Sequence, residues 1–307
     1  MAYKCISKNI YLLDPEPLGY KKQIALYLVK GSRYSALIDT GPKIVIDNVL
    51  ETLSSILGKD VESLKYIMLT HIHIDHGGGA ATLVKKLRDK YGIYARIMVH
   101  PRGAKHIIDP SKLWEASLKV LGKAAEIQGK PDSIDKEYVE ALNDNSKIDL
   151  GDAKILAVYT PGHAPHHISY IVYPDNIAIT GDAVAIHYDG RLHPVSPPPF
   201  KLDEALQSIE RLKSFKPKRI AVTHYDVVES DGIEVLEHAS MKIKQWYEII
   251  KGFVDKGIRD PREILEYILE VDYETKYIVE VRENNPIFKG SALRSVRGIL
   301  QYILSKS

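Results

Sequence analysis

The sequence contains a single cysteine, Cys5, among its 307 residues. No disulfide can therefore form within the chain, and zinc cages built from several cysteines are excluded. This scarcity is typical of proteins from a reducing compartment, so we expect a cytoplasmic location. The first residues, MAYKCISKNIYLLD, also lack the charged start and continuous apolar core of a signal peptide.

The sequence also lacks an excess of charge of either sign and any long apolar run. Its 42 basic and 40 acidic residues leave a formal net charge of +2, so no overall basic field favours nucleic acid or anionic lipid. No apolar stretch approaches the roughly 18 residues that a membrane span needs. We therefore expect no nucleic-acid partner and no membrane, while the composition leaves a local basic patch and a homo-oligomer open.

The pattern of apolar residues predicts two β-rich halves. The first half opens with NIYLLD and IALYLVKGSRYSALIDTG, where Gly31 and Ser32 indicate a hairpin turn, and continues through LKYIMLT and YARIMVH. The second half contains AKILAVYT, HISYIVYP, NIAITGD and RIAVTHYD. Between the halves, residues 101–147 are polar with helical spacing, which predicts a helical insertion.

The end of the chain is helical in pattern. Residues 229–307 hold three segments with apolar residues at helical spacing and no strand pattern. We predict a catalytic domain over residues 1–228, with the helical insertion at about 101–147, and a C-terminal helical region over residues 229–307. Alternation of strands and helices in both halves favours an α/β architecture of two packed sheets covered by helices.

The densest chemical signal is the stretch THIHIDHGGG, which places His71, His73, Asp75 and His76 within six residues. Because side chains alternate along an extended segment, His71, His73 and Asp75 would point one way and His76 the other. Neutral imidazole and carboxylate are ligands that Zn²⁺ and similar ions prefer. The spacing favours a metal centre over the alternative, a polar loop whose histidines cap the following helix.

Three further side chains of these types follow apolar strands later in the chain. His163 follows ILAVYT, Asp182 follows NIAIT, and His224 follows RIAV. Because each comes directly after a strand, one edge of the sheet pair would carry all three. The sequence therefore predicts a metal site that both halves complete.

This ordered set of motifs, which begins with the turn LIDTG at residues 37–41 and ends at His224, resembles the metallo-β-lactamase superfamily. The resemblance spans residues 8–226 and implies an αββα sandwich, here with a C-terminal helical appendage. It also implies two divalent metal ions, most often Zn²⁺, with Fe or Mn as alternatives. Their ligands would be His71, His73 and His163 for the first ion, Asp75, His76 and His224 for the second, and Asp182 as the bridge.

The resemblance further implies residues that support the ligands from behind. Asp39 would hold a ligand imidazole by a hydrogen bond, with a turn-capping aspartate as the alternative. His167 falls where relatives often carry a second supporting histidine. His166 replaces a glycine that is common in relatives, and we predict that it is a surface residue.

For activity, the resemblance implies hydrolysis. Two metal ions about 3.5–4 Å apart would share a hydroxide that attacks a carbonyl carbon. Asp75 would act as the catalytic residue that orients this nucleophile or accepts its proton. The glyoxalase II-like and lactonase-like branch is the most similar, so we expect a small-molecule ester, thioester or lactone as substrate. An aspartate at position 182, where class B β-lactamases usually carry cysteine, argues against β-lactams.

Two other activities stay open at this point. They are a mononuclear-iron oxidoreductase of the persulfide dioxygenase type, and a phosphodiesterase or nuclease.

Substrate contacts are expected from the loop VAIHYDGRLHPVSPPPF, which follows Asp182 directly. We predict that this loop hangs over the metals, so that His187, Tyr188 and His193 contact the substrate. Tyr225, beside His224, is a further candidate. The alternative for all four is a structural or solvated role.

Overall fold

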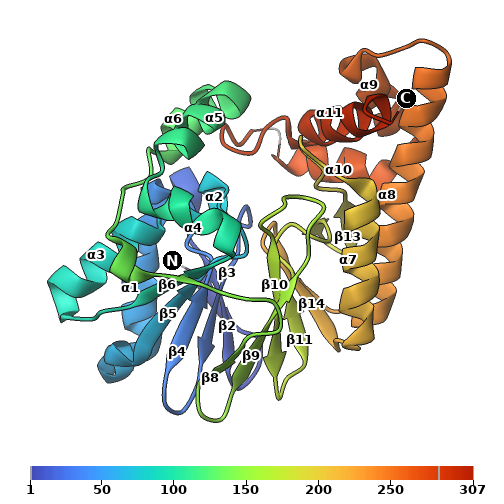
Figure 1. Cartoon of the computed structure of the whole chain (residues 1–307). Helices are drawn as coiled ribbons and strands as arrows, with labels where there is room; N and C mark the ends of the chain where they lie inside the picture. The colour runs from blue at the N-terminus through green and yellow to red at the C-terminus, as the bar shows by residue number, and fades with distance from the viewer. Residues whose placement is uncertain (1, 283, 307) are drawn as a thin grey trace.

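Two β-sheets pack face to face in the computed structural model, which describes residues 2–282 and 284–306 (Figure 1). Met1, Glu283 and Ser307 belong to the two predicted regions but lie outside the described residues. The first sheet has its strands in sequence order, antiparallel from β1 to β4 and parallel from β4 to β7. They are β1 (Ala2–Cys5), β2 (Ile10–Asp14), β3 (Leu26–Lys30), β4 (Ser35–Ile38), β5 (Leu64–Met68), β6 (Arg96–Val99) and β7 (Val139–Ala141).

The second sheet has the order β15-β14-β11-β10-β9-β8, and its only parallel pair among the described residues is β11 with β14. A separate hairpin, β12 with β13, follows the end of β11. These strands are β8 (Lys147–Asp149), β9 (Lys154–Tyr159), β10 (Ile168–Tyr173), β11 (Ile177–Ile179), β12 (Ile186–Tyr188), β13 (Arg191–His193), β14 (Arg219–Val222) and β15 (Asp226–Val228).

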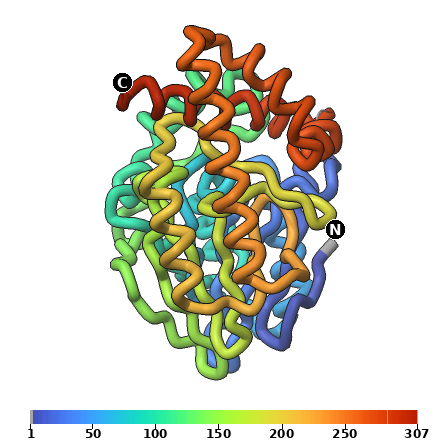
Figure 2. Tube along the Cα trace, turned by 90° about the vertical axis from the view of Figure 1, so that its right-hand side faces the viewer, coloured from blue at the N-terminus to red at the C-terminus, as the bar shows by residue number. Residues whose placement is uncertain are grey.

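Helices cover the outer face of each sheet. On the first sheet these are α1 (Ile46–Leu57) and α3 (Ala80–Tyr91). On the second they are α7 (Leu202–Ser214) and α8 (Gly232–Asp255), which lie side by side in Figure 2. The αββα sandwich that the sequence predicts is therefore confirmed. Short 3₁₀ helices occur at η1 (Pro17–Gly19), η2 (Lys43–Val45), η3 (Gly58–Ser63) and η4 (Lys136–Tyr138).

Strands in the middle of the first sheet are apolar on both faces because both faces are covered. In β4, Leu37 packs toward α1 and α3, whereas Ala36 and Ile38 pack into the space between the sheets. In β5 the same division separates Ile67 from Met68. This double burial explains why these strands appear in the sequence as apolar runs rather than as alternating patterns.

The predicted insertion at 101–147 is only partly helical. It contains α4 (Pro101–Ile108), α5 (Ser111–Leu121) and α6 (Lys123–Gln128), but also β7, which pairs with β6 at the edge of the first sheet. Strand β7 is three residues long and pairs along one edge, with β6. It is therefore too short to carry an alternating pattern that sequence reasoning could detect. Helices α5 and α6 stand above the end of the sandwich in Figure 1.

The C-terminal region comprises α8, α9 (Pro261–Val271), α10 (Tyr273–Arg282) and α11 (Ser291–Leu304). Helix α8 belongs to two cores at once. Leu236 packs on the second sheet, whereas Trp246 and Ile250 pack with α9 and α11. Because α8 packs in both cores, the C-terminal helices and the sandwich are not separated by a gap in packing at the predicted boundary between residues 228 and 229. No helix in the described ranges is both long and apolar enough to cross a membrane.

Candidate metal centre and its pocket

The four residues of the HIHIDH motif lie directly after β5. His71 and His73 are in the loop, whereas Asp75 and His76 belong to α2 (Ile74–Gly77), a single helical turn. The amides of His76 and Gly77 both donate to the carbonyl of His73, at 2.9 and 2.8 Å. The expectation that Asp75 lies in an extended segment is therefore wrong. A helical turn, rather than alternation along a strand, directs Asp75 and His76 toward the centre.

The second sheet supplies the other three predicted ligands from loops at the same end of the sandwich. His163 follows β9, Asp182 follows β11, and His224 lies between β14 and β15. Gly181, just before Asp182, has a φ of +52°, and a Cβ there would lie 2.7 Å from Nε2 of His167. Glycine is therefore required for the chain to deliver Asp182 so close to the supporting side chains.

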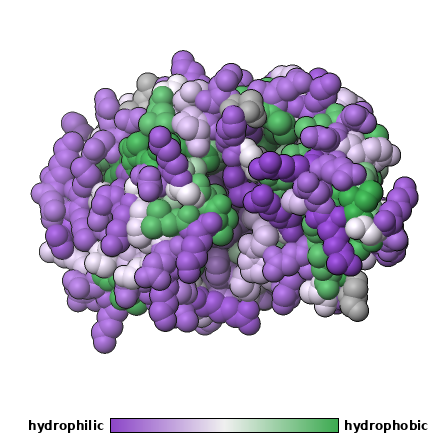
Figure 3. Space-filling view, turned by 90° about the horizontal axis from the view of Figure 1, so that it is seen from above, coloured by the Kyte–Doolittle hydropathy of each residue, from purple (hydrophilic) through white to green (hydrophobic). Residues whose placement is uncertain are grey.

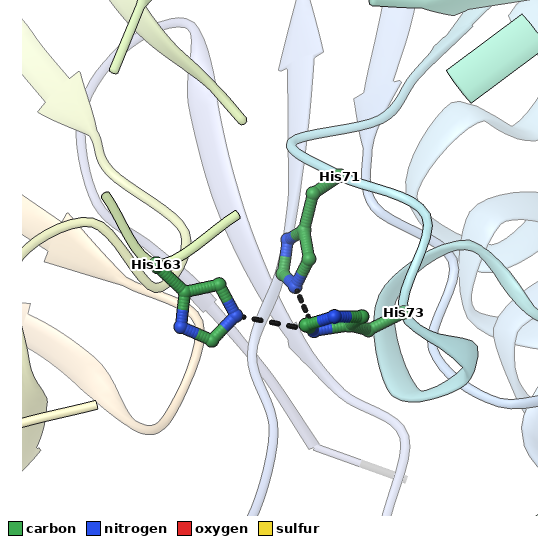
Figure 4. A group of neighbouring side chains, drawn as sticks. All are labelled: His71, His73 and His163. Atoms are coloured by element: carbon green, nitrogen blue, oxygen red, sulfur yellow. Dashed lines mark hydrogen bonds between the residues drawn. The ribbon is translucent and has the colours of Figure 1, made fainter. Parts of the chain in front are cut away.

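The structure brings all seven predicted ligands together. His71, His73 and His163 form one group, and Figure 4 shows their rings converging from the two halves of the chain. In this group, Nδ1 of His73 lies 2.9 Å from Nε2 of His71 and 3.1 Å from Nε2 of His163. The second group is Asp75, His76 and His224.

Asp182 lies between the two groups. Its Oδ2 is 3.5 Å from Nε2 of His163, and its Oδ1 is 3.4 Å from Nε2 of His76 and 3.6 Å from Nε2 of His224. Within the second group, Oδ2 of Asp75 is 3.5 Å from Nε2 of His224. One carboxylate thus faces both groups, which is the position a bridging ligand needs.

The tautomers of the histidines fit metal binding. Nδ1 of His163 donates to the carbonyl of Val195 and Nδ1 of His224 to the carbonyl of Gln23, both at 3.1 Å. A carbonyl only accepts, so each ring carries its proton on Nδ1 and presents the lone pair of Nε2 to the centre. Nε2 of His76 and Oδ1 of Asp182 are buried and have no hydrogen-bond partner. These unpartnered atoms and fixed lone pairs are the donor set that a divalent ion such as Zn²⁺ accepts.

Asp39 and Thr70 hold two further imidazoles. Oδ2 of Asp39 accepts from Nδ1 of His76 at 2.9 Å, and Oδ1 accepts from the amide of Thr70 at 2.8 Å. The hydroxyl of Thr70 donates to Asp39 and can therefore accept from Nδ1 of His71, at 3.1 Å. Both imidazoles thus direct Nε2 toward the candidate metal centre.

His167 supports Asp182. Its Nε2 accepts from the amide of Asp182 at 3.1 Å, and its Nδ1 lies 2.8 Å from the hydroxyl of Thr160. Asp39 and His167 thus occupy supporting positions behind the predicted ligands, as the resemblance implies.

The buried carboxylates make the candidate metal centre favourable for a cation. Burial lowers the pKa of His71 and His163, and it lowers the pKa of His73 to about 3. Burial also disfavours the charged form of His76, but the carboxylates around it, with Asp182 first, raise its pKa well above the usual value. Burial would likewise raise the pKa of Asp182, yet the surrounding imidazoles hold it well below its ordinary range. The carboxylates therefore attract a cation, whether a proton on His76 or a metal ion.

A pocket of about 370 Å³ opens over the centre. Its floor includes ligands of both groups, one wall comes from α5, and the opposite wall comes from the C-terminal helices. The loop after Asp182 also reaches the pocket, as predicted, through Val195 and residues 197–199. The two walls include Leu113, Ala116, Val120 and Leu121 from α5, and Arg282, Phe288 and Arg294 from the C-terminal region.

The four predicted substrate residues are not among the residues that line this pocket in the described part of the chain. His187 donates from Nδ1 to the carbonyl of Tyr225, and its Nε2 accepts from the amide of Gly190. The hydroxyl of Tyr188 donates to the carbonyl of Lys22. His187, Tyr188 and Tyr225 line a separate cavity of about 250 Å³. Backbone partners thus account for the side chains of His187 and Tyr188, which favours the structural alternative.

His193 packs among the C-terminal helices. Its ring centroid lies 5.1 Å from that of Trp246, and its Nδ1 lies 3.4 Å from the hydroxyl of Thr275. The loop turns between β12 and β13, so that its later residues, rather than its histidines, line the pocket over the candidate metal centre.

Sequence reasoning missed several pocket residues. His166, predicted to be on the surface, lines the pocket instead, with Nδ1 buried and unpartnered. Arg282 and Arg294 were not singled out because no motif marks them. A signal for Arg282 was present, since it lies at helical spacing from Thr275 and Ile278 on the buried face of α10. An arginine on such an apolar face is uncommon without a partner or a ligand.

A two-sheet sandwich that holds clustered histidines and aspartates at one end is typical of the metallo-β-lactamase fold, and the cluster is a potential metal site. The model of the metallo-beta-lactamase superfamily matches residues 19–224, so this chain belongs to that superfamily. The family and fold expected from the sequence are therefore confirmed.

The chain is similar to several known members. A metallo-beta-lactamase fold-containing protein of Sulfurisphaera tokodaii is 28% identical over 254 residues, which cover 81% of this chain and 89% of that protein. Its crystal structure aligns with a TM-score of 0.66 over 77% of this chain and 86% of that one. A metallo-beta-lactamase family protein of Thermus thermophilus shares the fold, with a TM-score of 0.69, 19% identity and coverage of 98% and 95%.

A more distant relative carries a specific name. An "atrochrysone carboxyl ACP thioesterase" of Aspergillus fumigatus is 21% identical over 200 residues, which cover 65% of this chain and half of that protein.

Proposed function

We propose that this protein is a binuclear metal-dependent hydrolase that cleaves a small-molecule ester, thioester or lactone. The observation that carries the proposal is the convergence of two ligand groups and Asp182 at the floor of one pocket. When bound, a pair of divalent ions, with Zn²⁺ favoured over Fe or Mn, lowers the pKa of water toward ~7 and polarises a carbonyl group.

Asp75 is the proposed proton-transfer residue. Its side chain lines the pocket beside His224. Burial favours the neutral carboxyl, but the charge of His76 and the nearby imidazole of His224 lower its pKa well below the usual range. The ionised carboxylate can accept a proton from a water molecule that adds to the carbonyl carbon. It can then return the proton to the departing sulfur or oxygen atom when the bond to that atom breaks.

Two observations support a small carbonyl substrate. A pocket of about 370 Å³ lies within the range of roughly 300–1,000 Å³ that is usual for small-molecule sites. Among acyl compounds, the name of the Aspergillus relative favours a thioester.

The test is an assay of purified protein whose metal content has been measured. Acyl thioesters, esters and lactones are compared with phosphodiesters and a persulfide. We expect two metal ions per chain and hydrolysis of at least one carbonyl class. Asp75→Asn should lower kcat by about 10²–10⁴-fold, which is the usual contribution of a positioned proton-transfer group. Cys5→Ser is the matched control, because Cys5 is exposed and does not line the pocket.

Two results would contradict the proposal. One iron per chain with oxygen consumption would instead establish an oxidoreductase. Cleavage of phosphodiesters that disappears in Asp75→Asn, without activity on any carbonyl substrate, would establish a phosphodiesterase.

A further inference from the structure

The pocket above the candidate metal centre has two chemically different walls. Side chains from α5, including Leu113, Val120 and Leu121, form an apolar wall. The C-terminal helices form the opposite wall, which contains the guanidinium groups of Arg282 and Arg294. Seen from above, apolar and polar surface meet around the middle of this end of the molecule (Figure 3). A ligand in the pocket would therefore contact apolar groups on one side and cations on the other.

Arg282, the last residue of α10, is 2% exposed. Its Nε and Nη1 are buried and have no hydrogen-bond partner. The guanidinium carbon lies 4.7 Å from the ring centroid of Phe288, and that ring lies 5.2 Å from the ring of His224. The stack with Phe288 holds the cation one aromatic ring away from a predicted metal ligand.

Arg294 projects from α11 into the same pocket. Its Nη1 donates to the carbonyl of Lys289 at 3.1 Å, which fixes one side of the guanidinium. No carboxylate in residues 2–282 or 284–306 forms an ion pair with either arginine. Burial lowers the pKa of both arginines, whereas the negative charge of Asp75 opposes this shift in both and that of Asp182 opposes it in Arg282. Both carboxylates, however, face the histidines of the candidate metal centre.

A buried cation without a partner is costly, so such groups persist mainly where a ligand completes them. Guanidinium groups match carboxylate and phosphate oxygens well, because their donors lie in one planar fork. Two guanidinium groups lie beside a predicted reaction centre, and one of them is buried with two unpartnered nitrogens, so their presence requires an explanation that folding alone does not supply.

We propose that Arg282 and Arg294 form an anion-binding subsite, which holds a carboxylate or phosphate group of the substrate while its apolar part lies against α5. This inference rests on the proposed hydrolase function, because that function makes the bound anion part of a substrate. It adds the substrate class, an ester, thioester or lactone that carries a negative charge at one end and an apolar group at the other.

The test measures anion binding without turnover. Inorganic phosphate, glutarate and the neutral analogue glutaramide are titrated calorimetrically into the purified, metal-containing protein. The variants are Arg282→Met and Arg294→Gln. Arg297→Gln is the matched control, because Arg297 lies one turn further along α11, is exposed and does not line the pocket.

We expect each of the two pocket variants to weaken binding of at least one anion by about tenfold or more, the usual scale for a charge-assisted hydrogen bond. The control should stay within about twofold of the original affinity, and glutaramide binding should not change in any variant. Whichever anion loses more affinity identifies the group, carboxylate or phosphate. Binding of both anions that is unchanged in Arg282→Met and Arg294→Gln would overturn the subsite.

Thermal unfolding separates this role from a structural one. Removing an unpartnered buried charge should leave the unfolding midpoint of Arg282→Met unchanged or higher. A lower midpoint together with unchanged anion affinity would instead identify Arg282 as a structural residue.

The two proposals fail in distinguishable ways. Arginine-dependent anion binding without hydrolysis of any carbonyl substrate would retain the subsite and reject the hydrolase. Hydrolysis with anion binding that is independent of both arginines would do the reverse. For any charged substrate that is cleaved, Arg294→Gln should raise KM for that substrate and not for its neutral amide.

Discussion

Oδ2 of Asp39 lies 2.9 Å from Nδ1 of His76, and both side chains are buried behind the candidate metal centre. The carboxylate accepts the Nδ1 proton and so orients Nε2 of His76 toward Asp182. Asp39 also accepts from the amide and hydroxyl of Thr70, which in turn contacts His71. One buried aspartate therefore orients an imidazole in each ligand group.

Asp39→Asn should weaken metal binding by about 10–100-fold, the usual effect of losing a partner behind a ligand. The amide can still accept a hydrogen bond, but it has no charge to stabilise the His76 ring. Metal affinity is measured by competition with a chromophoric chelator. Asp60→Asn, which alters an exposed carboxylate paired with Lys30, should bind metal like the original protein. Equal affinity in both variants would show that Asp39 has only a turn-capping role.

Metal binding at pH 7 should release about one proton per chain, because ligands must be deprotonated. The neighbouring carboxylates raise the pKa of His76, so its charged form is favoured in the metal-free protein at pH 7 and is lost only as pH rises through that elevated value. The three histidines of the first group, His71, His73 and His163, have lowered pKa values and contribute no proton. Calorimetric titration with Zn²⁺ in buffers of different ionisation enthalpy measures the release. A value near zero at pH 7, rising at lower pH, would contradict the assignment to His76.

Breaking the buried ion pair between Lys242 and Asp272 should cost about 3–5 kcal/mol of unfolding free energy. Asp272 also accepts hydrogen bonds from Trp246 and Thr275, so Asp272→Ala leaves several donors in the C-terminal core without an acceptor. Asp255→Ala, which removes the exposed partner of Lys251, is the control and should cause no measurable change. Denaturant unfolding at pH 7 is the measurement, and equal effects of the two substitutions would be inconsistent with the buried network.

The same network predicts a dependence of stability on pH. Burial would raise the pKa of Asp272, but the bonds from Lys242, Trp246 and Thr275 lower it below the usual value. Its stabilising contribution is therefore present above the unfolded carboxyl pKa of about 3.9 and is lost as pH falls through the lower folded value. Asp272→Asn should flatten the loss of unfolding free energy in this acidic range.

Gly298 and Gly252 should respond oppositely to alanine. A Cβ at Gly298 would lie 1.8 Å from the carbonyl oxygen of Ser196, so Gly298→Ala must push α11 away from the loop, at a cost of about 1–3 kcal/mol. Gly252 lies in α8 with nothing near its Cβ position, so Gly252→Ala should stabilise the protein by about 0.5–1 kcal/mol. The two unfolding midpoints are compared by calorimetry. A Gly298→Ala protein as stable as the original would show that this close approach is not needed.

The sequence predicted the centre better than its surroundings, for a physical reason. Ligands such as His71 and His163 must be of a few residue types at fixed strand ends, so the constraint is visible in one chain. The conformation that presents them is less constrained, and the helical turn at Asp75 was therefore missed.

Pocket walls are harder to predict because their residues meet only in the folded chain. Leu121 and Arg294 lie far apart in sequence and in separate helices, and each could equally serve a core or a surface. Hydrogen bonds between a side chain and nearby backbone, such as the two that His187 forms, also cannot be predicted from the residue types in the sequence. Polar residues beside a motif were therefore poor guides to the lining.

The hydrogen-bond acceptors that orient the predicted ligands differ in how they tolerate mutation. His163 and His224 are oriented by the backbone carbonyls of Val195 and Gln23, which every residue type provides. Positions 23 and 195 can therefore change identity over evolutionary time while the imidazoles keep their orientation. His76 depends on the side chain of Asp39, so substitution there has no such protection. The orientation of His163 and His224 is thus robust to sequence drift, whereas a single nucleotide change at the codon for Asp39 can disturb that of His76.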